Sequence, residues 1–155
     1  MNNKFSDTKK YKKGKTISQI WQADDSTELE CPIYKEAFSA GFPSPATDYI
    51  ENTLDLNKFL IQHPSATFFV RVEGDSMINA GIRSGDILIV DRAIQPEEHK
   101  IVIAVINEEL TIKRIKIIKK KIYLEPDNPD FNLIEVTPEM DFRIWGVVTY
   151  VIHKT

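Results

Sequence analysis

The sequence has few of the residues that bind metals or close disulfides. Its 155 residues include one cysteine, Cys31, and three histidines, His63, His99 and His153. One cysteine forms neither an internal disulfide nor a thiolate cluster, and no histidine stands at a ligand spacing from a carboxylate or thiol. The segment GDSMINAG also lacks the Gly-Lys-Ser/Thr ending of a phosphate-binding loop. We therefore expect no metal and no cofactor, and the scattered histidines disfavour a Ser-His-Asp triad, which spacing alone does not exclude.

Long apolar runs are also missing. No stretch approaches the roughly 18 apolar residues that a membrane-spanning helix needs, and no apolar segment follows the basic start MNNKFSDTKKYKKGK. These features predict a cytoplasmic protein without a membrane anchor. The hydrophobic content of 42% and charged content of 28% are typical of a globular protein, and the length favours one domain with a tail.

Positive charge is concentrated at the start of the chain. Residues 1–22 carry a net charge of +5, which leaves −8 for the remainder because the whole chain carries −3. The basic residues of this segment are Lys4, Lys9, Lys10, Lys12, Lys13 and Lys15, set against Asp7. Such an arm could bind nucleic acid through counterion release. A solvated, flexible tail is the favoured interpretation, because the acidic remainder would repel a phosphate backbone.

The hydrophobic pattern predicts a mostly β protein. Residues 1–30 show no sustained periodicity and are expected to form a flexible arm, while residues 37–49 contain Pro43 and Pro45 and should be extended and accessible. Residues 52–63 have helical spacing, with Asn52 or Thr53 as the N-cap. Two-residue alternation then predicts six strands, at 67–72, 86–91, 100–106, 110–117, 121–126 and 142–152. We expect a compact antiparallel β-sandwich or barrel-like domain with one short helix and a flexible N-terminal arm.

Two residues in this pattern could carry chemistry. Alternation in ELTIKRIKI places Lys113 on the same face as Thr111, Ile115 and Ile117. Burial among apolar side chains lowers the pKa of a lysine, and a neutral amine can deprotonate a serine. Ser76 follows a strand end through Gly74, so its hydroxyl and backbone N–H could both face a substrate. For each residue alone, a structural role is the favoured alternative: a lysine that reaches to water, and a serine that caps a turn.

Together these motifs resemble a known family. GDSM, GIRSGDILIVDRA and ELTIKRIKI, with AGFPSPATDYIENTLDLNKFLIQHPSATFFV before them, are similar to the S24 self-cleaving peptidases, the family of LexA and UmuD, and to the UmuD-like branch in particular. The resemblance implies that Ser76 is the nucleophile and Lys113 its general base. It also implies cleavage between Ala40 and Gly41, with the backbone N–H groups of Asp75 and Ser76 as the oxyanion site.

The resemblance also implies a biological setting. Cleavage would remove residues 1–40 as the arm and leave residues 41–155 as the peptidase-like β domain. The expected activator is the RecA filament on single-stranded DNA, in the SOS response. The processed form would be a homodimer that joins a UmuC-type error-prone polymerase in translesion synthesis, with a sliding clamp as a further candidate partner. The 40 residues before the cut show no paired helical pattern, so sequence-specific DNA binding is not expected.

Two alternatives stay open. A binding module of the same fold would dock on a polymerase or a sliding clamp without cutting itself, and would be stable at full length even with the activator. A signal peptidase acting on other proteins uses the same Ser/Lys chemistry, but the absence of a membrane anchor disfavours it.

Overall fold

The computed structural model describes residues 17–34 and 50–155. They belong to two units, which we describe separately: one contains the chain up to Ala23 and from His63 onward, and the other is Asp24–Gln62. None of the helices among the described residues is long and apolar enough to cross a membrane.

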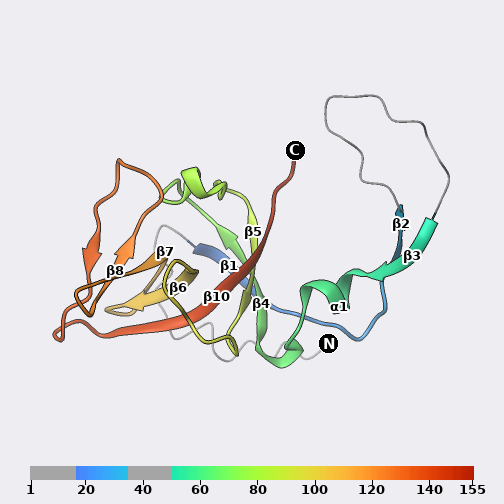
Figure 1. Cartoon of the computed structure of the whole chain (residues 1–155), viewed down its shortest axis with the longest axis horizontal. Coiled ribbons are helices and arrows are strands. Elements are labelled where there is room, and N and C mark those ends of the chain that lie inside the picture. The colour runs from blue at the N-terminus through green and yellow to red at the C-terminus, as the bar shows by residue number, and fades with distance from the viewer. Residues whose placement is uncertain (1–16, 35–49) are drawn as a thin grey trace. The chain divides into compact units, whose positions relative to one another are not determined.

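The first unit is built on an eight-stranded antiparallel sheet that curls into a half-barrel (Figure 1). The six strands predicted from the sequence are all present, and the expectation of a mostly β fold with one short helix is confirmed. Across the sheet the strands are β1 (Ile17–Gln22), β4 (Thr67–Val72), β5 (Ile87–Asp91), β10 (Phe142–Ile152), β6 (Ile101–Ile106), β7 (Glu109–Ile118), β8 (Lys121–Glu125) and β9 (Ile134–Glu135). The short 3₁₀ segments Pro64–Ala66 and Ile78–Ala80 flank β4 in sequence.

Tight turns hold β7 between its two neighbours. Asn107 and Glu108 connect β6 to β7 with φ of 48° and 69°, and Lys119 and Lys120 connect β7 to β8 with φ of 49° and 65°. Positive φ at both central residues is typical of the type I′ turn, whose twist matches that of the flanking strands. These hairpins fix the register of β7, the strand that carries Lys113.

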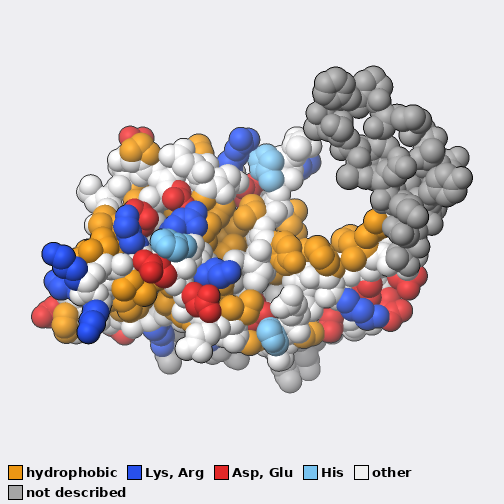
Figure 2. Space-filling view, in the orientation of Figure 1, with side chains coloured by type: hydrophobic (Ala, Val, Ile, Leu, Met, Phe, Trp, Pro, Cys, Tyr) orange, Lys and Arg blue, Asp and Glu red, His pale blue; other side chains and the backbone are white. Residues whose placement is uncertain are grey.

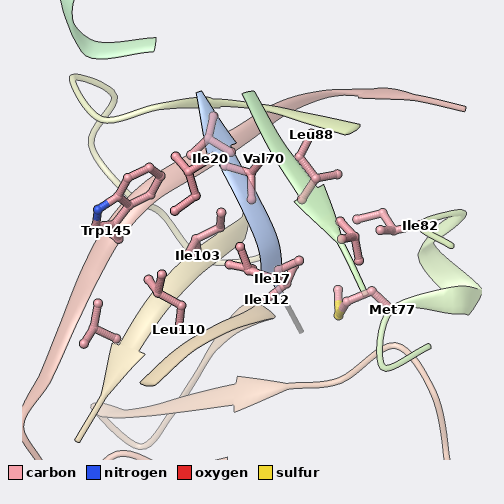
Figure 3. Packing of buried hydrophobic residues seen from close by; sticks show 13 residues of the cluster. Ile17, Ile20, Val70, Met77, Ile82, Leu88, Ile103, Leu110, Ile112 and Trp145 are labelled. Atoms are coloured by element: carbon pink, nitrogen blue, oxygen red, sulfur yellow. The ribbon is translucent and has the colours of Figure 1, made fainter. Parts of the chain in front are cut away.

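The main hydrophobic core unites strands that are far apart in the sequence. Figure 3 shows its side chains converging from β1, β4, β5, β6, β7 and β10, with two more from the loop after β4. The buried members are Ile17, Ile20, Val70, Val72, Met77, Ile82, Leu88, Val90, Ile103, Val105, Leu110, Ile112 and Trp145. A second cluster contains Val102, Ala104, Ile115, Leu124 and Val147. Alternate residues of β6 enter the two clusters, which explains its continuous apolar sequence.

Strand β1 corrects the prediction that residues 1–30 lack regular structure. It pairs antiparallel with β4, and the side chains of Ile17 and Ile20 are only 1% and 9% exposed. The register shifts between Ile17 and Gln19, which places the two buried isoleucines three residues apart instead of two. This irregularity hides the strand from a search for simple alternation.

The second unit contains a hairpin and the helix. Strand β2 (Glu30–Tyr34) pairs with β3 (Ile50–Asp55), and α1 is Leu56–Leu60. The helix is shorter than the predicted 52–63, because the first residues of that range pair in β3. Asp55, and neither Asn52 nor Thr53, caps it by accepting hydrogen bonds from the backbone N–H groups of Asn57 and Lys58.

Charges of both signs are mixed over strands β6 to β8. In the view of Figure 2, the Lys and Arg side chains there stand next to Asp and Glu side chains. Three ion pairs involve residues of β7 and β8, namely Arg114–Asp127, Lys116–Glu125 and Lys121–Glu135. This face therefore presents no basic stripe of the kind that tracks a nucleic acid backbone. The six lysines of the predicted arm lie outside the described residues.

Candidate active site

The loop that carries Ser76 is closed at its base. Val72 is the last residue of β4. Its backbone N–H donates a hydrogen bond to Asp86 O, and its carbonyl oxygen accepts one from Gly85 N, each at 2.9 Å. Gly74, at φ 88°, turns the chain and donates its N–H to the hydroxyl of Ser84 at 3.2 Å. A φ of this sign favours glycine. The strand end, the glycine turn and the closed base together position the serine.

Met77 anchors the residue after the serine in the core. Its side chain is 2% exposed and lies near Ile82 (Figure 3). The Met77 carbonyl accepts hydrogen bonds from Ala80 N and Ile82 N at 3.0 and 3.3 Å, and its sulfur accepts from Asp127 N at 3.4 Å. Core packing and hydrogen bonds therefore hold the residue that follows Ser76.

Lys113 lies directly beside Ser76. Its Nζ donates hydrogen bonds to Ser76 Oγ at 3.1 Å, to Thr111 Oγ1 at 3.1 Å and to the carbonyl oxygen of Ile112 at 2.9 Å. In sheet order β4 and β7 are four strands apart, so a flat sheet would separate them by about 19 Å. The curl of the sheet brings the end of β4 close to β7.

Both side chains are buried, and this changes the lysine. Ser76 is 7% exposed and Lys113 is 5% exposed. Burial lowers the pKa of Lys113 from its usual 10.5 to about 8, because the charged form loses solvation. At pH 7 about one lysine in ten is then neutral, compared with roughly one in three thousand at the usual pKa.

The predicted shielding of Lys113 is only partly correct. Ile115, on the same face, is 4% exposed, but Ile117 is 46% exposed and does not enclose the amine. Strand β7 passes from the core to the surface between these two positions. Sequence alternation gave the correct face but did not show where along the strand burial ends.

Asn128 fixes the peptide group that precedes the serine. Its side-chain Nδ2 donates to the carbonyl oxygen of Asp75 at 2.9 Å, and Ile78 N donates to the same oxygen at 3.2 Å. This carbonyl shares a planar peptide group with the N–H of Ser76, which points the opposite way. The hydrogen bonds to the Asp75 oxygen therefore also fix the direction of the Ser76 N–H. Within the part of the chain that the structure describes, neither the Asp75 nor the Ser76 N–H donates to another backbone oxygen.

Asn128 was not predicted to be a site residue, because the sequence PDNPD is typical of an ordinary turn. Asn128 also lines a hollow of about 420 Å³ beside the serine loop, together with Asn79 and Phe131. Nothing in the local sequence links residue 128 to residue 75. The link exists only in the folded chain.

The other candidate groups stand apart from this pair. His63 and His153 bond to the buried carboxylates of Asp91 and Asp86 at 2.6 and 2.7 Å. In residues 17–34 and 50–155, no group of three or more His, Cys, Asp or Glu side chains is arranged to hold a metal ion. Ala40 and Gly41, the predicted cleavage site, lie outside the described residues.

Comparison with known proteins identifies a matching family and several similar proteins. The family model described as peptidase S24-like matches residues 32–149. The chain is 49% identical to protein ImpA of Escherichia coli over 126 residues, which cover 80% of this chain and 84% of ImpA. It is 49% identical to protein SamA of Salmonella typhimurium over 84% of this chain and 91% of SamA. Protein MucA of Escherichia coli is 42% identical over 77% of this chain and 82% of MucA.

Proposed function

The chain belongs to the peptidase S24-like family, and from this premise we propose that it is a serine peptidase that cuts its own backbone between Ala40 and Gly41. One observation carries the proposal: the Nζ of Lys113 lies 3.1 Å from Ser76 Oγ in a buried site that lowers the pKa of the lysine to about 8. A serine hydroxyl needs an adjacent base to become a nucleophile, and this amine is within reach.

The proposed reaction gives Ser76 and Lys113 the roles that the family resemblance implies, and their 3.1 Å separation supports these roles. Neutral Lys113 takes the proton of Ser76 Oγ as the oxygen attacks the carbonyl carbon of Ala40. The N–H groups of Ser76 and Asp75 stabilise the negative charge on the carbonyl oxygen. The C–N bond then breaks, and the Lys113 ammonium returns the proton to the amine of Gly41. Water hydrolyses the resulting ester between Ala40 and Ser76 and frees the serine.

A small residue on each side of the cut suits such a buried site. Alanine and glycine bring the backbone to Ser76 with little steric cost, and glycine also permits backbone angles that other residues avoid. Because the substrate belongs to the same molecule, its effective concentration is high and few catalytic groups suffice. A slow enzyme of this type is controlled by an activator that favours the cleavage-competent conformation. On the family resemblance, this activator is the RecA filament on single-stranded DNA.

We place the product in the SOS response. On the same resemblance, residues 41–155 form a homodimer that serves a UmuC-type translesion polymerase, with a sliding clamp as a further partner. The similarity to ImpA, SamA and MucA over most of the chain supports this setting. In this proposal the peptidase step produces a binding subunit, and no turnover of other proteins is needed.

The test is the intact mass of the purified chain after incubation near pH 10, where the neutral lysine is abundant. We expect a new species that begins at Gly41, absent from Ser76→Ala and Lys113→Ala. Lys116→Ala is the matched control, because Lys116 lies on the same strand but pairs with Glu125, and this variant should still cut.

Two results would contradict the proposal. One is cutting at Gly41 by a folded Ser76→Ala variant. The other is a chain that stays whole near pH 10 and also with RecA, ATP and single-stranded DNA, which would favour the non-cleaving binding module.

A further inference from the structure

Strand β1 is an edge of the eight-stranded sheet, and β4 is its neighbour in that sheet. Its two isoleucines complete the main core, where Figure 3 shows Ile17 and Ile20 packed among side chains of β4 to β7. The proposed cut at Ala40 lies between β1 and β4 in the sequence. Self-cleavage therefore separates two strands that the fold places side by side.

The backbone of β4 shows what the loss of β1 would uncover. Thr67 O accepts a hydrogen bond from Ala23 N at 2.9 Å, so its carbonyl faces the β1 side. Val72 N bonds to Asp86 O at 2.9 Å, on the β5 side. Because backbone groups alternate along a strand, the N–H groups of Phe69 and Arg71 also face β1. Without β1, these groups form an open sheet edge beside an apolar groove.

Cleavage lowers the effective concentration of β1 at the β4 edge, although the contacts of bound β1 stay the same. While the chain is whole, the tether gives β1 an effective concentration on the order of millimolar. After the cut, β1 must bind as a separate chain at the micromolar concentrations of an ordinary experiment. The fragment that carries β1 also carries β2, which pairs with β3 of the retained part. The occupancy of β1 then depends on its own six residues and two buried isoleucines, at an effective concentration about a thousandfold lower than in the whole chain once the fragment has dissociated.

We propose that self-cleavage converts the β4 edge into a binding site for an extended segment of a partner protein that carries aliphatic side chains in the positions of Ile17 and Ile20. This inference rests on the proposed function. An added strand supplies main-chain hydrogen bonds, and the two core pockets select its side chains. A second processed copy is not the partner, because it has lost its own β1.

The side chains on the other face of β1 indicate which further residues the partner segment should carry. Gln19 Oε1 accepts a hydrogen bond from Arg71 Nε at 3.0 Å, and the Arg71 guanidinium lies 5.6 Å from the ring centroid of Trp21. A glutamate in the place of Gln19 would form a charge-assisted bond with this arginine. The partner segment should therefore carry an acidic or amide residue between its two aliphatic residues and an aromatic residue after the second.

The experiment separates this site from the peptidase activity. A Ser76→Ala chain is given the recognition sequence of a specific protease within residues 35–49, so the cut does not depend on Ser76. The fragment that carries β1 and β2 is first separated from the cut chain. The probe is a fluorescein-labelled peptide of residues 16–23, added at equal concentration to this cut chain and to the uncut chain. We expect an anisotropy increase with the cut chain and at least tenfold weaker binding to the uncut chain. A control peptide with Ile17→Asp and Ile20→Asp should not bind.

Hydrogen exchange provides a second measurement with an internal control. After the cut, the Phe69 and Arg71 amides should exchange faster, and excess peptide should restore their protection. The Phe68 and Val70 amides face β5 and should stay protected throughout. Equal binding by cut and uncut chains, no binding by the cut chain, or loss of protection across the sheet would each overturn the inference. A wild-type chain that never cuts itself would refute the proposed function, and the peptide result would still decide whether the edge binds a strand.

Discussion

The pH dependence of self-cleavage gives the sharpest test of Lys113 as the base. If the rate follows the fraction of neutral lysine, a pKa of about 8 predicts an increase of about tenfold between pH 7 and pH 9, and then a plateau. A lysine with the usual pKa would instead give an increase of about a hundredfold over the same interval, with no plateau below pH 10. The two cases differ in the shape of the curve as well as in its size.

The same shift predicts a change in stability. The pKa of Lys113 is lower in the folded chain than in the unfolded chain, so between about pH 8 and 10.5 the unfolded chain binds the extra proton. Stability should therefore rise with pH across this window, and the cost of burying the charge is fully present below pH 8. That cost is about 3 kcal/mol at most. Lys113→Met loses the hydrogen bonds to Ser76, Thr111 and the Ile112 carbonyl, so we expect a net gain of about 1 kcal/mol at pH 7.

The assay measures both consequences on the same proteins. The initial rate of appearance of the species that begins at Gly41 is followed by mass from pH 6.5 to 10.5, with Lys113→Arg as an uncut control because guanidinium stays protonated. Urea unfolding of Lys113→Met and Ser76→Ala at pH 7 and 10.5 gives the stabilities. A rate that still rises tenfold per pH unit at pH 9.5, together with a methionine variant that is less stable at pH 7, would refute the buried-base argument.

Three further predictions concern the surroundings of the pair. Asn128→Ala removes the donor to the Asp75 carbonyl, so cleavage should slow by about tenfold while the midpoint of the pH profile stays near 8, as single-turnover mass measurements would show. An unchanged rate would mean that this hydrogen bond does not position the Ser76 peptide. Gly146→Ala places a methyl group 2.6 Å from Val90 Cγ1, and urea unfolding should show a loss of about 1 to 3 kcal/mol. Gly81→Ala meets no atom within 4 Å but keeps a φ of 78°, so the loss should be smaller, about 1 kcal/mol, and a larger loss than that of Gly146→Ala would contradict the clash argument.

The sequence predicted the regular part of the fold well. The six strands with clear alternation or continuous apolar runs are all present, because a half-buried or fully buried strand leaves that pattern in its residues. Strand β1 escaped because its bulge breaks the two-residue period. Strands β2 and β3 form a hairpin of their own, and the residues of β3 also fit a helical spacing. In that segment, pairing with β2 overrides the local preference.

Some features of the site can be predicted from the local sequence, and others depend on contacts between distant parts of the chain. The face of Lys113 and the glycine turn before Ser76 are local features, and both could be read from the sequence. The 3.1 Å distance between Lys113 Nζ and Ser76 Oγ depends on the curl of the sheet, because β4 and β7 are four places apart in it. The contact of Asn128 with Asp75 spans 53 positions and leaves no local pattern. The cleavage-site residues Ala40 and Gly41 and the roles of Ser76 and Lys113 remain predictions.

Lys113 differs from the buried aspartates Asp86 and Asp91 in its hydrogen-bond partners. Asp86 and Asp91 are also buried, but each accepts hydrogen bonds from a backbone N–H and a histidine. Among the described residues, the hydrogen bonds of the Lys113 amine all go to neutral oxygens. A carboxylate in the same place would hold the proton on the amine and raise its pKa. The missing counter-charge therefore destabilises the fold at neutral pH, and the same feature lowers the pKa of the amine, as the proposed role of Lys113 as a base requires.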